Sequence, residues 1–312
     1  MNKKILVTGA AGFLGSNLCK RLVVDGFEVI GVDNFYTGSK SNLQDLANNN
    51  RFTLIEHDIN QPLNVPCDWI FNFACPASPP HYQKDPIFTA KTNFIGGLNM
   101  LELARANNAR IMQASTSEVY GNPLQHPQTE QYWGNVHTTG PRACYDEGKR
   151  VVEALFFDYK RMYNLDIKVI RIFNTYGPGM DPNDGRVVSN FIMQALRGEP
   201  ITLYGTGEQT RSFCYVDDLI NGIVAMMHSD ASITGPINLG NPIEFTLKEL
   251  VETLGTVLGR KLNVITMPLP EDDPTRRQPD ITLAQKELGW TPGVDLATGL
   301  KKTIAYFEQF VQ

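Results

Sequence analysis

The sequence lacks both a long hydrophobic run and a strongly basic segment. Its longest apolar stretches, such as residues 69–75, are broken by polar residues well short of the roughly 20 that cross a bilayer. No run of lysine and arginine exceeds two residues, and the formal net charge is -5. Neither a nucleic-acid partner nor a membrane partner is therefore expected. The expected partners are small molecules.

Cysteine is scarce and scattered as well. The five cysteines lie at positions 19, 67, 75, 144 and 214 and contain no CxxC pair. Such a set indicates reduced thiols in a cytoplasmic protein and argues against a disulfide framework or a zinc site. The histidines show no metal-ligand spacing, so no metal is expected. A strand-like segment starts directly after residues 1–4 without a visible targeting segment, which also favours the cytoplasm.

The length and the hydrophobic pattern predict the fold class. A chain of 312 residues exceeds the roughly 250–300 at which one core usually stops growing, so two domains are expected. The first half alternates short apolar runs with helical spacing at residues 17–26, 85–107 and 145–163, which predicts an α/β fold with a Rossmann-like, doubly wound parallel sheet. The predicted strands are residues 4–9, 27–34, 52–59, 68–74, 109–115 and 167–174.

The pattern changes after about Gly177. Glycine- and proline-rich loops are followed by a predicted strand at residues 200–205. Three amphipathic helices are predicted at residues 216–229, 246–259 and 296–310. We assign residues 1–176 to the first domain and residues 177–312 mainly to a smaller C-terminal α/β domain. A chain crossover back to the first domain is left open.

A glycine-rich turn follows the first predicted strand. In TGAAGFLG, Gly9, Gly12 and Gly15 have the spacing GxxGxxG and lead into a helix. Glycines there let the backbone approach a pyrophosphate, whose charge meets the helix N-terminus, and Phe13 and Leu14 complete the turn. Such a pattern is weak evidence alone, but its place between a strand and a helix favours a dinucleotide site.

An acidic residue ends the second predicted strand. Asp33 lies 18 residues past Gly15, where a carboxylate accepts hydrogen bonds from ribose hydroxyls and repels a 2′-phosphate, so NAD is favoured over NADP. Alternatively, Asp33 merely begins the turn DNFYTG. Asn34 belongs to the same predicted site. Asp58 and Ile59 in HDI are assigned to it as well, although aspartate there is also a common turn residue.

Tyr145 and Lys149 form the candidate catalytic pair. They lie four residues apart on a predicted helix and share one face. A lysine ammonium near a phenol lowers the phenol pKa from about 10, which suits proton exchange with a sugar hydroxyl. A second YxxxK, from Tyr36 to Lys40, lies in a predicted loop and is set aside. Thr116 ends the fifth predicted strand and is placed to hold the same substrate oxygen.

The segments TGAAGFLG, STSEVYG, YDEGK and RIFNTYGPGM resemble an extended short-chain dehydrogenase/reductase acting on nucleotide sugars, over essentially the whole chain. Within that family, ACPASPPHYQKDP, GPRACYDEGKR, NDGRVVSNF, YGTGEQTRSF and DDPTRRQPDI resemble the UDP-glucuronate decarboxylases. The resemblance implies NAD, UDP-glucuronate as substrate, a homodimer, and a catalytic core of Thr116, Tyr145 and Lys149. A sugar-nucleotide 4,6-dehydratase would be expected to carry an Asp-Glu pair where this chain has Ser117-Glu118, which argues against water elimination.

The resemblance also implies roles for two further catalytic residues. Arg211 is the candidate for orienting the substrate carboxylate or supporting the proton donor. Glu118 is the candidate for general acid/base chemistry near C5 of the sugar. Found alone, Arg211 would be an ordinary surface arginine and Glu118 an ordinary turn carboxylate.

The substrate contacts are assigned in the same way. Ser78, His81 and Tyr82 either line the sugar pocket or pack within a loop stiffened by three prolines. For the UDP half we expect arginines that pair with phosphate, an aromatic ring that stacks on uracil, and backbone contacts from RVVSNF. The candidates are Asn174, Arg186, Tyr204, Gln209, Arg211 and Arg276. Tyr204 is alternatively a core aromatic residue, and Arg276 is not distinguishable from the adjacent Arg277.

The chemistry that these residues suggest starts with oxidation. Tyr145 takes the proton of the C4 hydroxyl while NAD takes the C4 hydride, which places a ketone β to the C6 carboxylate. A β-keto acid loses carbon dioxide readily, and return of the hydride then gives UDP-xylose. Three alternatives stay open: an oxidative decarboxylase that releases a UDP-4-keto-pentose, a UDP-sugar 4-epimerase, and a non-catalytic NAD-binding regulator. The first domain is expected to bind NAD and the second mainly the UDP-sugar.

Overall fold

The computed structural model describes residues 3–268 and 277–311. Its centre is a seven-stranded sheet in the order β11-β6-β5-β4-β1-β2-β3, in which every neighbouring pair is parallel. The strands are β1 (Lys4–Thr8), β2 (Glu28–Asp33), β3 (Phe52–Glu56), β4 (Trp69–Asn72), β5 (Arg110–Thr116), β6 (Ile167–Ile172) and β11 (Ile237–Leu239). The predicted Rossmann-like parallel sheet is confirmed.

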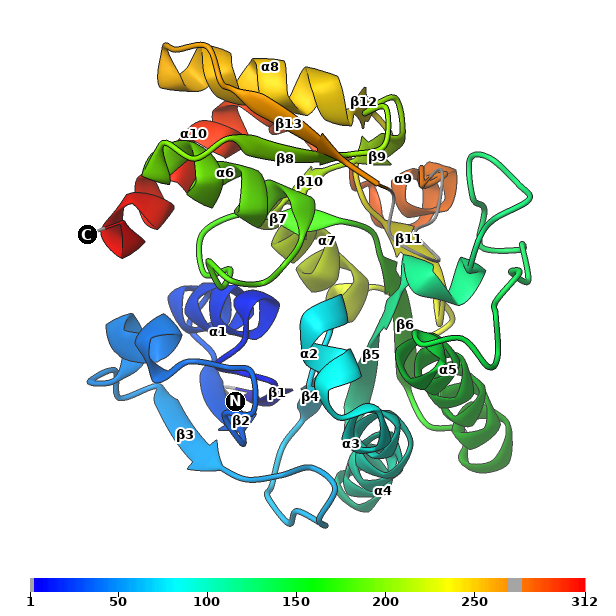
Figure 1. The fold of residues 1–312 in the computed structure, drawn as a ribbon. Helices are drawn as coiled ribbons and strands as arrows, with labels where there is room; N and C mark the ends of the chain where they lie inside the picture. The colour runs from blue at the N-terminus through cyan, green and yellow to red at the C-terminus, as the bar shows by residue number, and fades with distance from the viewer. Residues whose placement is uncertain (1–2, 269–276, 312) are drawn as a thin grey trace.

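Helices cover both faces of the sheet (Figure 1). One face carries α1 (Phe13–Val24) and α7 (Val216–His228), and the other carries α3 (Pro86–Lys91), a π-helical turn η2 (Thr92–Gly96), α4 (Gly97–Asn107) and α5 (Ala143–Tyr163). Successive residues of β1 serve the two sides, since Ile5 and Val7 pack toward α1 and Leu6 toward α4. The predicted helical stretch 85–107 is therefore divided in two by the π-helical turn.

The chain returns to the sheet after leaving it. β6 is followed by β7 (Thr175–Tyr176), α6 (Val187–Arg197), β8 (Ile201–Tyr204), β9 (Thr210–Ser212), β10 (Cys214–Tyr215), and then by α7 and β11. Because β11 pairs with β6, residues beyond 176 contribute to the central sheet as well as to the smaller layer. The sequence analysis missed β11, since three residues are too few to show a strand pattern.

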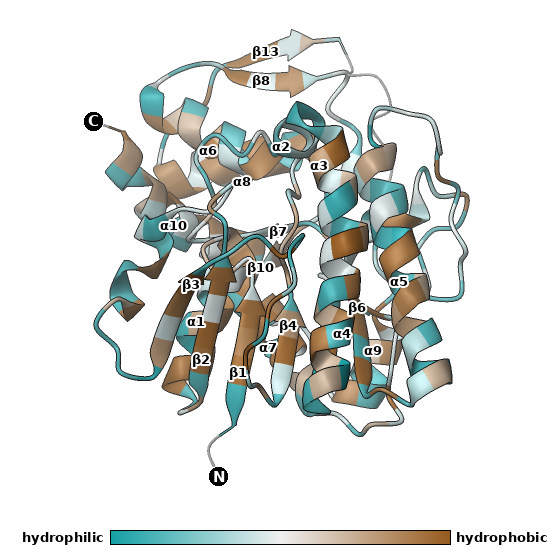
Figure 2. Cartoon of the chain, turned by 90° about the horizontal axis from the view of Figure 1, so that it is seen from below, coloured by the Kyte–Doolittle hydropathy of each residue, from teal (hydrophilic) through white to brown (hydrophobic). Residues whose placement is uncertain are grey.

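The smaller layer lies over the carboxyl ends of the strands (Figures 1 and 2). In it β8 pairs with β13 in parallel and β9 pairs with β12 in antiparallel fashion. The remaining elements are η1 (Lys40–Leu46), α2 (Pro79–Lys84), η3 (Ser117–Tyr120), β12 (Glu244–Thr246), α8 (Leu247–Leu258), β13 (Val264–Met267), α9 (Thr282–Leu288), α10 (Leu296–Phe307) and η4 (Glu308–Phe310). No helix among the described residues is long and apolar enough to span a membrane.

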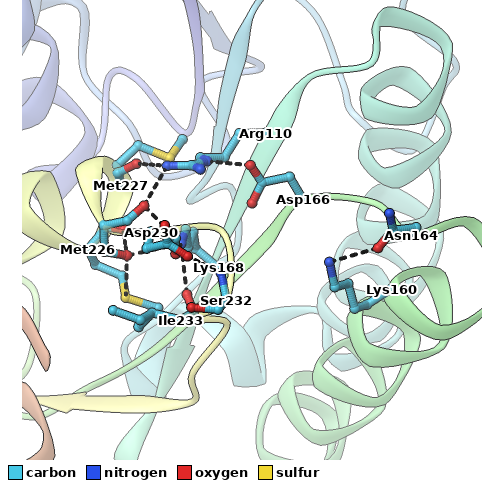
Figure 3. A network of polar contacts seen from close by, with 11 residues as sticks. Arg110, Lys160, Asn164, Asp166, Lys168, Met226, Met227, Asp230, Ser232 and Ile233 are labelled. Carbon is cyan, nitrogen blue, oxygen red and sulfur yellow. Dashed lines mark hydrogen bonds and ion pairs between the residues drawn. The ribbon is translucent and has the colours of Figure 1, made fainter.

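Lys168 and Arg110, near the amino ends of β6 and β5, bind the C-terminal end of α7 and the residues that follow it (Figure 3). Lys168 of β6 donates to the carbonyl of Asp230 at 2.6 Å. Arg110 of β5 donates to the carbonyls of Met227 and Ser229 at 2.7 and 2.9 Å. The last carbonyls of a helix lack partners within the helix, and Arg110 satisfies that of Met227 in the last turn of α7. Lys168 binds the segment that follows the helix. Burial lowers the pKa of Lys168 to about 8.

A second buried network fastens α5. Glu153 accepts a hydrogen bond from Ser115 and pairs with Arg171 of β6, with Nη2–Oε2 at 2.7 Å and Nε–Oε1 at 3.0 Å. The Glu153 and Arg171 side chains are only 11% and 12% exposed. Lys149 lies one helical turn before Glu153 on the same helix. The network therefore holds the part of α5 that carries the candidate catalytic pair.

We expect Glu153→Ala to lower the free energy of unfolding by about 3–5 kcal/mol, because it leaves a buried arginine unpaired. Asp158→Ala is the matched control, since Asp158 forms an exposed pair with Arg161 on the same helix, and about 0–1 kcal/mol is expected. Urea denaturation of the two variants measures both effects. Equal losses would contradict the assigned importance of the buried network.

Candidate active site

One large cavity lies at the carboxyl ends of the parallel strands, between the sheet and the smaller layer. Its volume is about 1010 Å³, at the upper end of the roughly 300–1,000 Å³ typical of a small-molecule site. The glycine-rich turn, the ends of β4 and β5, the start of α5, and α6 and β8 all contribute to its wall. Carboxyl ends of strands are where open parallel sheets bind ligands.

The glycine turn forms one end of the cavity. Gly9 has φ +66°, a left-handed conformation that favours glycine. A Cβ on Gly15 would lie 2.0 Å from the carbonyl oxygen of Gly9, so only glycine lets the first turn of α1 approach the loop. Gly12 is the N-cap of α1 and offers no side-chain cap, which leaves backbone N–H groups of the helix start directed at the cavity, beside Phe13 and Leu14.

Asp33 lies beside this turn at the end of β2. Its Oδ2 accepts a hydrogen bond from the N–H of Ala11, and its Oδ1 accepts one from the N–H of Phe35, both at 2.8 Å. Burial raises the pKa of Asp33, and the backbone hydrogen bonds oppose that rise. Asn34, Asp58 and Ile59 line the same end of the cavity, although β3 ends at Glu56 and Asp58 lies in the following turn.

These residues fit a dinucleotide. The side-chain-free turn admits a pyrophosphate close to the backbone, and the helix N-terminus favours its negative charge. The carboxylate of Asp33 stands where a ribose would follow. Among the described residues no group of three or more His, Cys, Asp and Glu side chains could hold a metal ion.

The structure brings Thr116, Tyr145 and Lys149 together at the middle of the cavity. The Thr116 side chain acts on the Tyr145 phenol and lowers its pKa, and its hydroxyl oxygen accepts the N–H of Glu118 at 3.2 Å. The Nζ of Lys149 donates to the carbonyl of Ala114 at 2.9 Å and lies 5.7 Å from the Tyr145 ring centroid. A strand end and one helix face thus supply the three side chains, as predicted.

The electrostatics of this group differ from the sequence-based expectation. Burial raises the pKa of Tyr145 and lowers the pKa of Lys149, because each charged form loses its hydration. Cys75, when ionised, would raise the pKa of both groups, but burial raises the pKa of its own thiol. The expected lowering of the phenol pKa by the lysine is therefore outweighed by burial.

Tyr82 packs flat against the catalytic candidate. Its ring is stacked on that of Tyr145, with centroids 5.1 Å apart and planes 7° apart. Ser78 is the N-cap of α2, and its Oγ lies 2.8 Å from Nδ1 of His81. All of these side chains line the cavity. The proline-rich loop is thus part of the cavity wall. Its side chains both line the cavity and pack on neighbouring residues, so the two alternatives given for this loop hold together.

Glu118 is the centre of a buried ion cluster next to Thr116. It forms a two-pronged pair with Arg277 and a second pair with Arg142, whose Nη2 lies 2.9 Å from Oε2. Arg277 also donates to Oγ of Ser117 at 3.4 Å. Burial alone would raise the pKa of Glu118, but the two arginines outweigh burial and hold its pKa well below the usual range. Glu118 is therefore a stable carboxylate.

Arg142 was not predicted as a site residue, and Arg277 was left as an alternative to Arg276 for contact with phosphate, without its pairing to Glu118. Arg142 lies in GPRACYDEGKR, and Arg277 is adjacent to the candidate Arg276. Their shared partner is 24 residues away in one case and 159 in the other, so no local pattern indicated it. Arg276 itself lies outside the described residues.

The remaining substrate candidates all line the cavity on the side of the smaller layer: Asn174, Arg186, Tyr204, Gln209 and Arg211. Arg186 donates to the carbonyl of Ala77 at 2.6 Å. Tyr204 is 41% exposed, so it is not a core aromatic residue. RVVSNF, from which backbone contacts to uracil are predicted, begins a helix: Arg186 is the N-cap residue of α6, and the following residues are helical.

A model described as the NAD dependent epimerase/dehydratase family matches residues 5–240. The chain belongs to this family. UDP-glucuronic acid decarboxylase 1 from Danio rerio is 52% identical over 307 residues, which span 98% of this chain and 73% of the relative. UDP-glucuronic acid decarboxylase 6 from Arabidopsis thaliana is 54% identical over 300 residues, spanning 96% and 87%.

Solved structures of the family agree with the fold. UDP-glucuronic acid 4-epimerase from Bacillus cereus, in complex with UDP-glucuronic acid and NAD, superposes with a TM-score of 0.88. It is 30% identical, and the match covers 98% of this chain and 99% of the epimerase chain. The family uses NAD, in agreement with the glycine turn and the carboxylate of Asp33.

The position of Asp33 predicts cofactor preference. We expect the unmodified protein to bind NAD much more tightly than NADP, because the carboxylate accepts ribose hydroxyls and repels a 2′-phosphate. Asp33→Asn should lower the preference for NAD, measured as the dissociation constant of NADP divided by that of NAD, by at least about tenfold. The substitution removes the charge that repels the 2′-phosphate and keeps one hydrogen-bond acceptor for the ribose. Fluorescence titration with each cofactor measures the ratio. Equal affinities in the unmodified protein would rule out this role for Asp33.

Proposed function

We propose that the protein is an NAD-dependent UDP-glucuronate decarboxylase that converts UDP-glucuronate to UDP-xylose and carbon dioxide. The observation that carries this proposal is the placement of Arg142 and Arg277 beside Thr116, Tyr145 and Lys149. The catalytic group suits oxidation of a sugar hydroxyl, and the two arginines suit a neighbouring carboxylate. Curated relatives at 52–54% identity over almost the whole chain carry the same activity in their names.

The first chemical task falls to Tyr145. As a phenolate it takes the proton of the C4 hydroxyl, and Thr116 hydrogen-bonds the same oxygen. The nicotinamide of NAD, when bound, supplies the acceptor and later the donor of the C4 hydride. Tyr145 would ionise more readily beside a bound nicotinamide cation, because a positive charge stabilises a phenolate and opposes the effect of burial on the pKa. Lys149 acts in the same direction when it is protonated.

The second task is loss of carbon dioxide. The 4-keto acid releases the C6 carboxylate because the C5–C6 electron pair is delocalised into the C4 carbonyl as an enolate. Protonated Tyr145 and Thr116 donate hydrogen bonds to that oxygen, where negative charge develops. The arginine pair orients the carboxylate before it leaves, and Arg211 remains a further candidate for this role. C5 is then protonated on the side of Glu118, which lines the same cavity.

The UDP half of the substrate is assigned to the smaller layer. Arg186 at the start of α6 suits the diphosphate, and the exposed ring of Tyr204 suits stacking on uracil. Asn174 and Gln209 add polar groups along the same wall. Ser78 and Tyr82 face the sugar from α2. This layout separates the cofactor end of the cavity from the nucleotide-sugar end.

We expect turnover to be redox-neutral. UDP-glucuronate should yield UDP-xylose and carbon dioxide in equal amounts, without stoichiometric growth of the reduced-nicotinamide absorbance band, because the hydride leaves C4 and returns to C4. Mass spectrometry and proton NMR identify the products. Persistent growth of that band together with a UDP-4-keto-pentose would indicate the oxidative decarboxylase instead. An unchanged carbon count with inverted C4 would indicate a 4-epimerase, and no turnover would indicate a regulator.

Tyr145→Phe tests the assignment of the base. The variant should keep its fold and its NAD affinity, since a single hydroxyl is removed, while kcat falls by roughly 100-fold or more because the C4 proton has no acceptor. Tyr36→Phe is the matched control in the other YxxxK segment and should retain activity. Loss of activity in the control and not in the Tyr145 variant would mean that the wrong tyrosine was chosen.

We further propose a homodimer formed through α3, η2, α4 and α5, within the two predicted stretches 85–107 and 145–163. Apolar side chains are exposed on α3, η2 and α5, including Ile87 (68%), Phe94 (44%) and Met162 (71%). In Figure 2 hydrophobic segments alternate with hydrophilic ones along α3, α4 and α5. Two copies would bury these faces as a four-helix interface.

The free state of all five cysteines supports a cytoplasmic location, which cell fractionation tests.

Light scattering should give twice the 34.8 kDa of one chain at micromolar concentration. Met162→Glu should shift the protein toward the monomer, because a charge would then face the apolar interface. Val24→Glu is the control, since Val24 is 83% exposed on α1, on the opposite side of the sheet. A monomeric unmodified protein would reject this interface.

A further inference from the structure

A buried carboxyl group belongs to the charged cluster around Glu118. Asp146 follows Tyr145 on α5, is 7% exposed, and is not among the residues that line the cavity. Its Oδ1 is buried and has no hydrogen-bond partner among the described residues. Buried carboxylate oxygens are normally hydrogen-bonded, so an unpartnered one requires an explanation.

Charged groups surround Asp146 from several elements. Glu118 of η3, Arg142 before α5 and Arg277 all act on it electrostatically, as does Glu147 on its own helix. The phenol of Tyr82 on α2 and the thiol of Cys144 are the other titratable groups coupled to it. Two carboxyl groups therefore share two arginines in one buried cluster. Burial, followed by the charge of Glu118, raises the pKa of Asp146 to about 7.

The proposed decarboxylation needs a proton that its other components do not supply. Loss of carbon dioxide leaves the electron pair of the C5–C6 bond on the sugar, and C5 must then bind one proton. The proton that Tyr145 takes from the C4 hydroxyl returns to that oxygen when C4 is reduced. One proton per turnover must therefore enter the cavity from elsewhere. Glu118 is a poor store for it, because Arg142 and Arg277 hold it as a carboxylate.

We propose that Asp146 is a positioning residue that stores this proton and delivers it to C5 through Glu118. When the acidic sugar enters, its carboxylate adds a negative charge beside the cluster, and Asp146 takes up a proton from solvent. After carbon dioxide leaves, Asp146 passes its proton to the Glu118 carboxylate and itself becomes a carboxylate. Glu118 passes that proton on to C5 and returns to its ionised form. Solvent then recharges Asp146. The proposal rests on the decarboxylase function and adds a source for its proton.

Proton uptake on binding is the direct test. NAD-loaded Tyr145→Phe protein, which should bind substrate without turnover, is titrated with UDP-glucuronate by calorimetry in buffers of different ionisation enthalpy. About one proton should be taken up per site at pH 8, where Asp146 starts deprotonated, and much less at pH 6, where it is already protonated. UDP-glucose, which carries no carboxylate, should cause little uptake. No uptake at pH 8 with UDP-glucuronate would overturn the proposal without any change at Asp146.

Substitutions assign the proton to its residue. Adding Asp146→Asn to the Tyr145→Phe protein should abolish the uptake, while Glu147→Gln, which removes the neighbouring charge on the same helix, should leave it nearly unchanged. Retained uptake in a folded, NAD-binding Asp146→Asn protein would overturn the proposal. Asp146→Glu keeps a carboxyl group and should restore most of the uptake. Restored proton uptake in Asp146→Glu would show that Asp146→Asn lost the ionisable group and not the local structure.

The pH profile of turnover separates this inference from the proposed function. In the unmodified protein kcat/KM should fall as pH rises through about 7, because this ratio reports the free enzyme, in which Asp146 loses the stored proton above its raised pKa. Asp146→Asn should lower kcat by about 10- to 100-fold and lose that limb, with NAD affinity within twofold. If the unmodified enzyme forms UDP-xylose but the Asp146→Asn variant shows the same fall of activity with rising pH, the role of Asp146 is rejected and the proposed function stands. An unmodified protein that forms no UDP-xylose would reject the function itself.

Discussion

The pairing of Glu118 with Arg142 and Arg277 is the contact on which the active site depends. It joins the end of β5, the start of α5 and a segment more than 150 residues away in the sequence. Opposite charges in a buried site interact strongly, whereas each of the three would be costly to bury alone. Their mutual attraction therefore fixes the distance between the strand end that carries Thr116 and the helix that carries Tyr145.

The same cluster explains why the site suits an acidic sugar. When Asp146 is protonated, the two arginines face a single carboxylate, that of Glu118, which leaves a net positive charge next to the candidate catalytic group. A second carboxylate, from the substrate, would balance that charge, whereas a neutral sugar would leave it unbalanced. Burial strengthens the preference, because screening by water is weak there. Charge balance, and not only shape, therefore selects the substrate class.

Much of the fold and part of the site could be predicted from the sequence because the signals are local. Apolar runs of strand length mark β1 to β6, and the GxxGxxG turn reflects a steric need that Gly15 shows directly, through its contact with the carbonyl of Gly9. The contacts that were missed are long-range. β11 is a strand only because β6 offers it a parallel edge, and Arg277 is a site residue only because Glu118 is its partner. The pKa of Tyr145 was misjudged for the same reason, since burial depends on the whole fold.

Asp33 shows how cofactor choice and loop structure are joined. Its two oxygens bind the N–H groups of Ala11 in the glycine turn and of Phe35 after β2, so the carboxylate is fixed in place by the protein itself. A fixed acceptor loses little conformational entropy when a ribose arrives, and that preorganisation increases affinity. The glycine turn is held at the same time in the shape that receives the pyrophosphate. One side chain thus aligns both halves of the dinucleotide site, and a change of cofactor preference at this position would also loosen the turn.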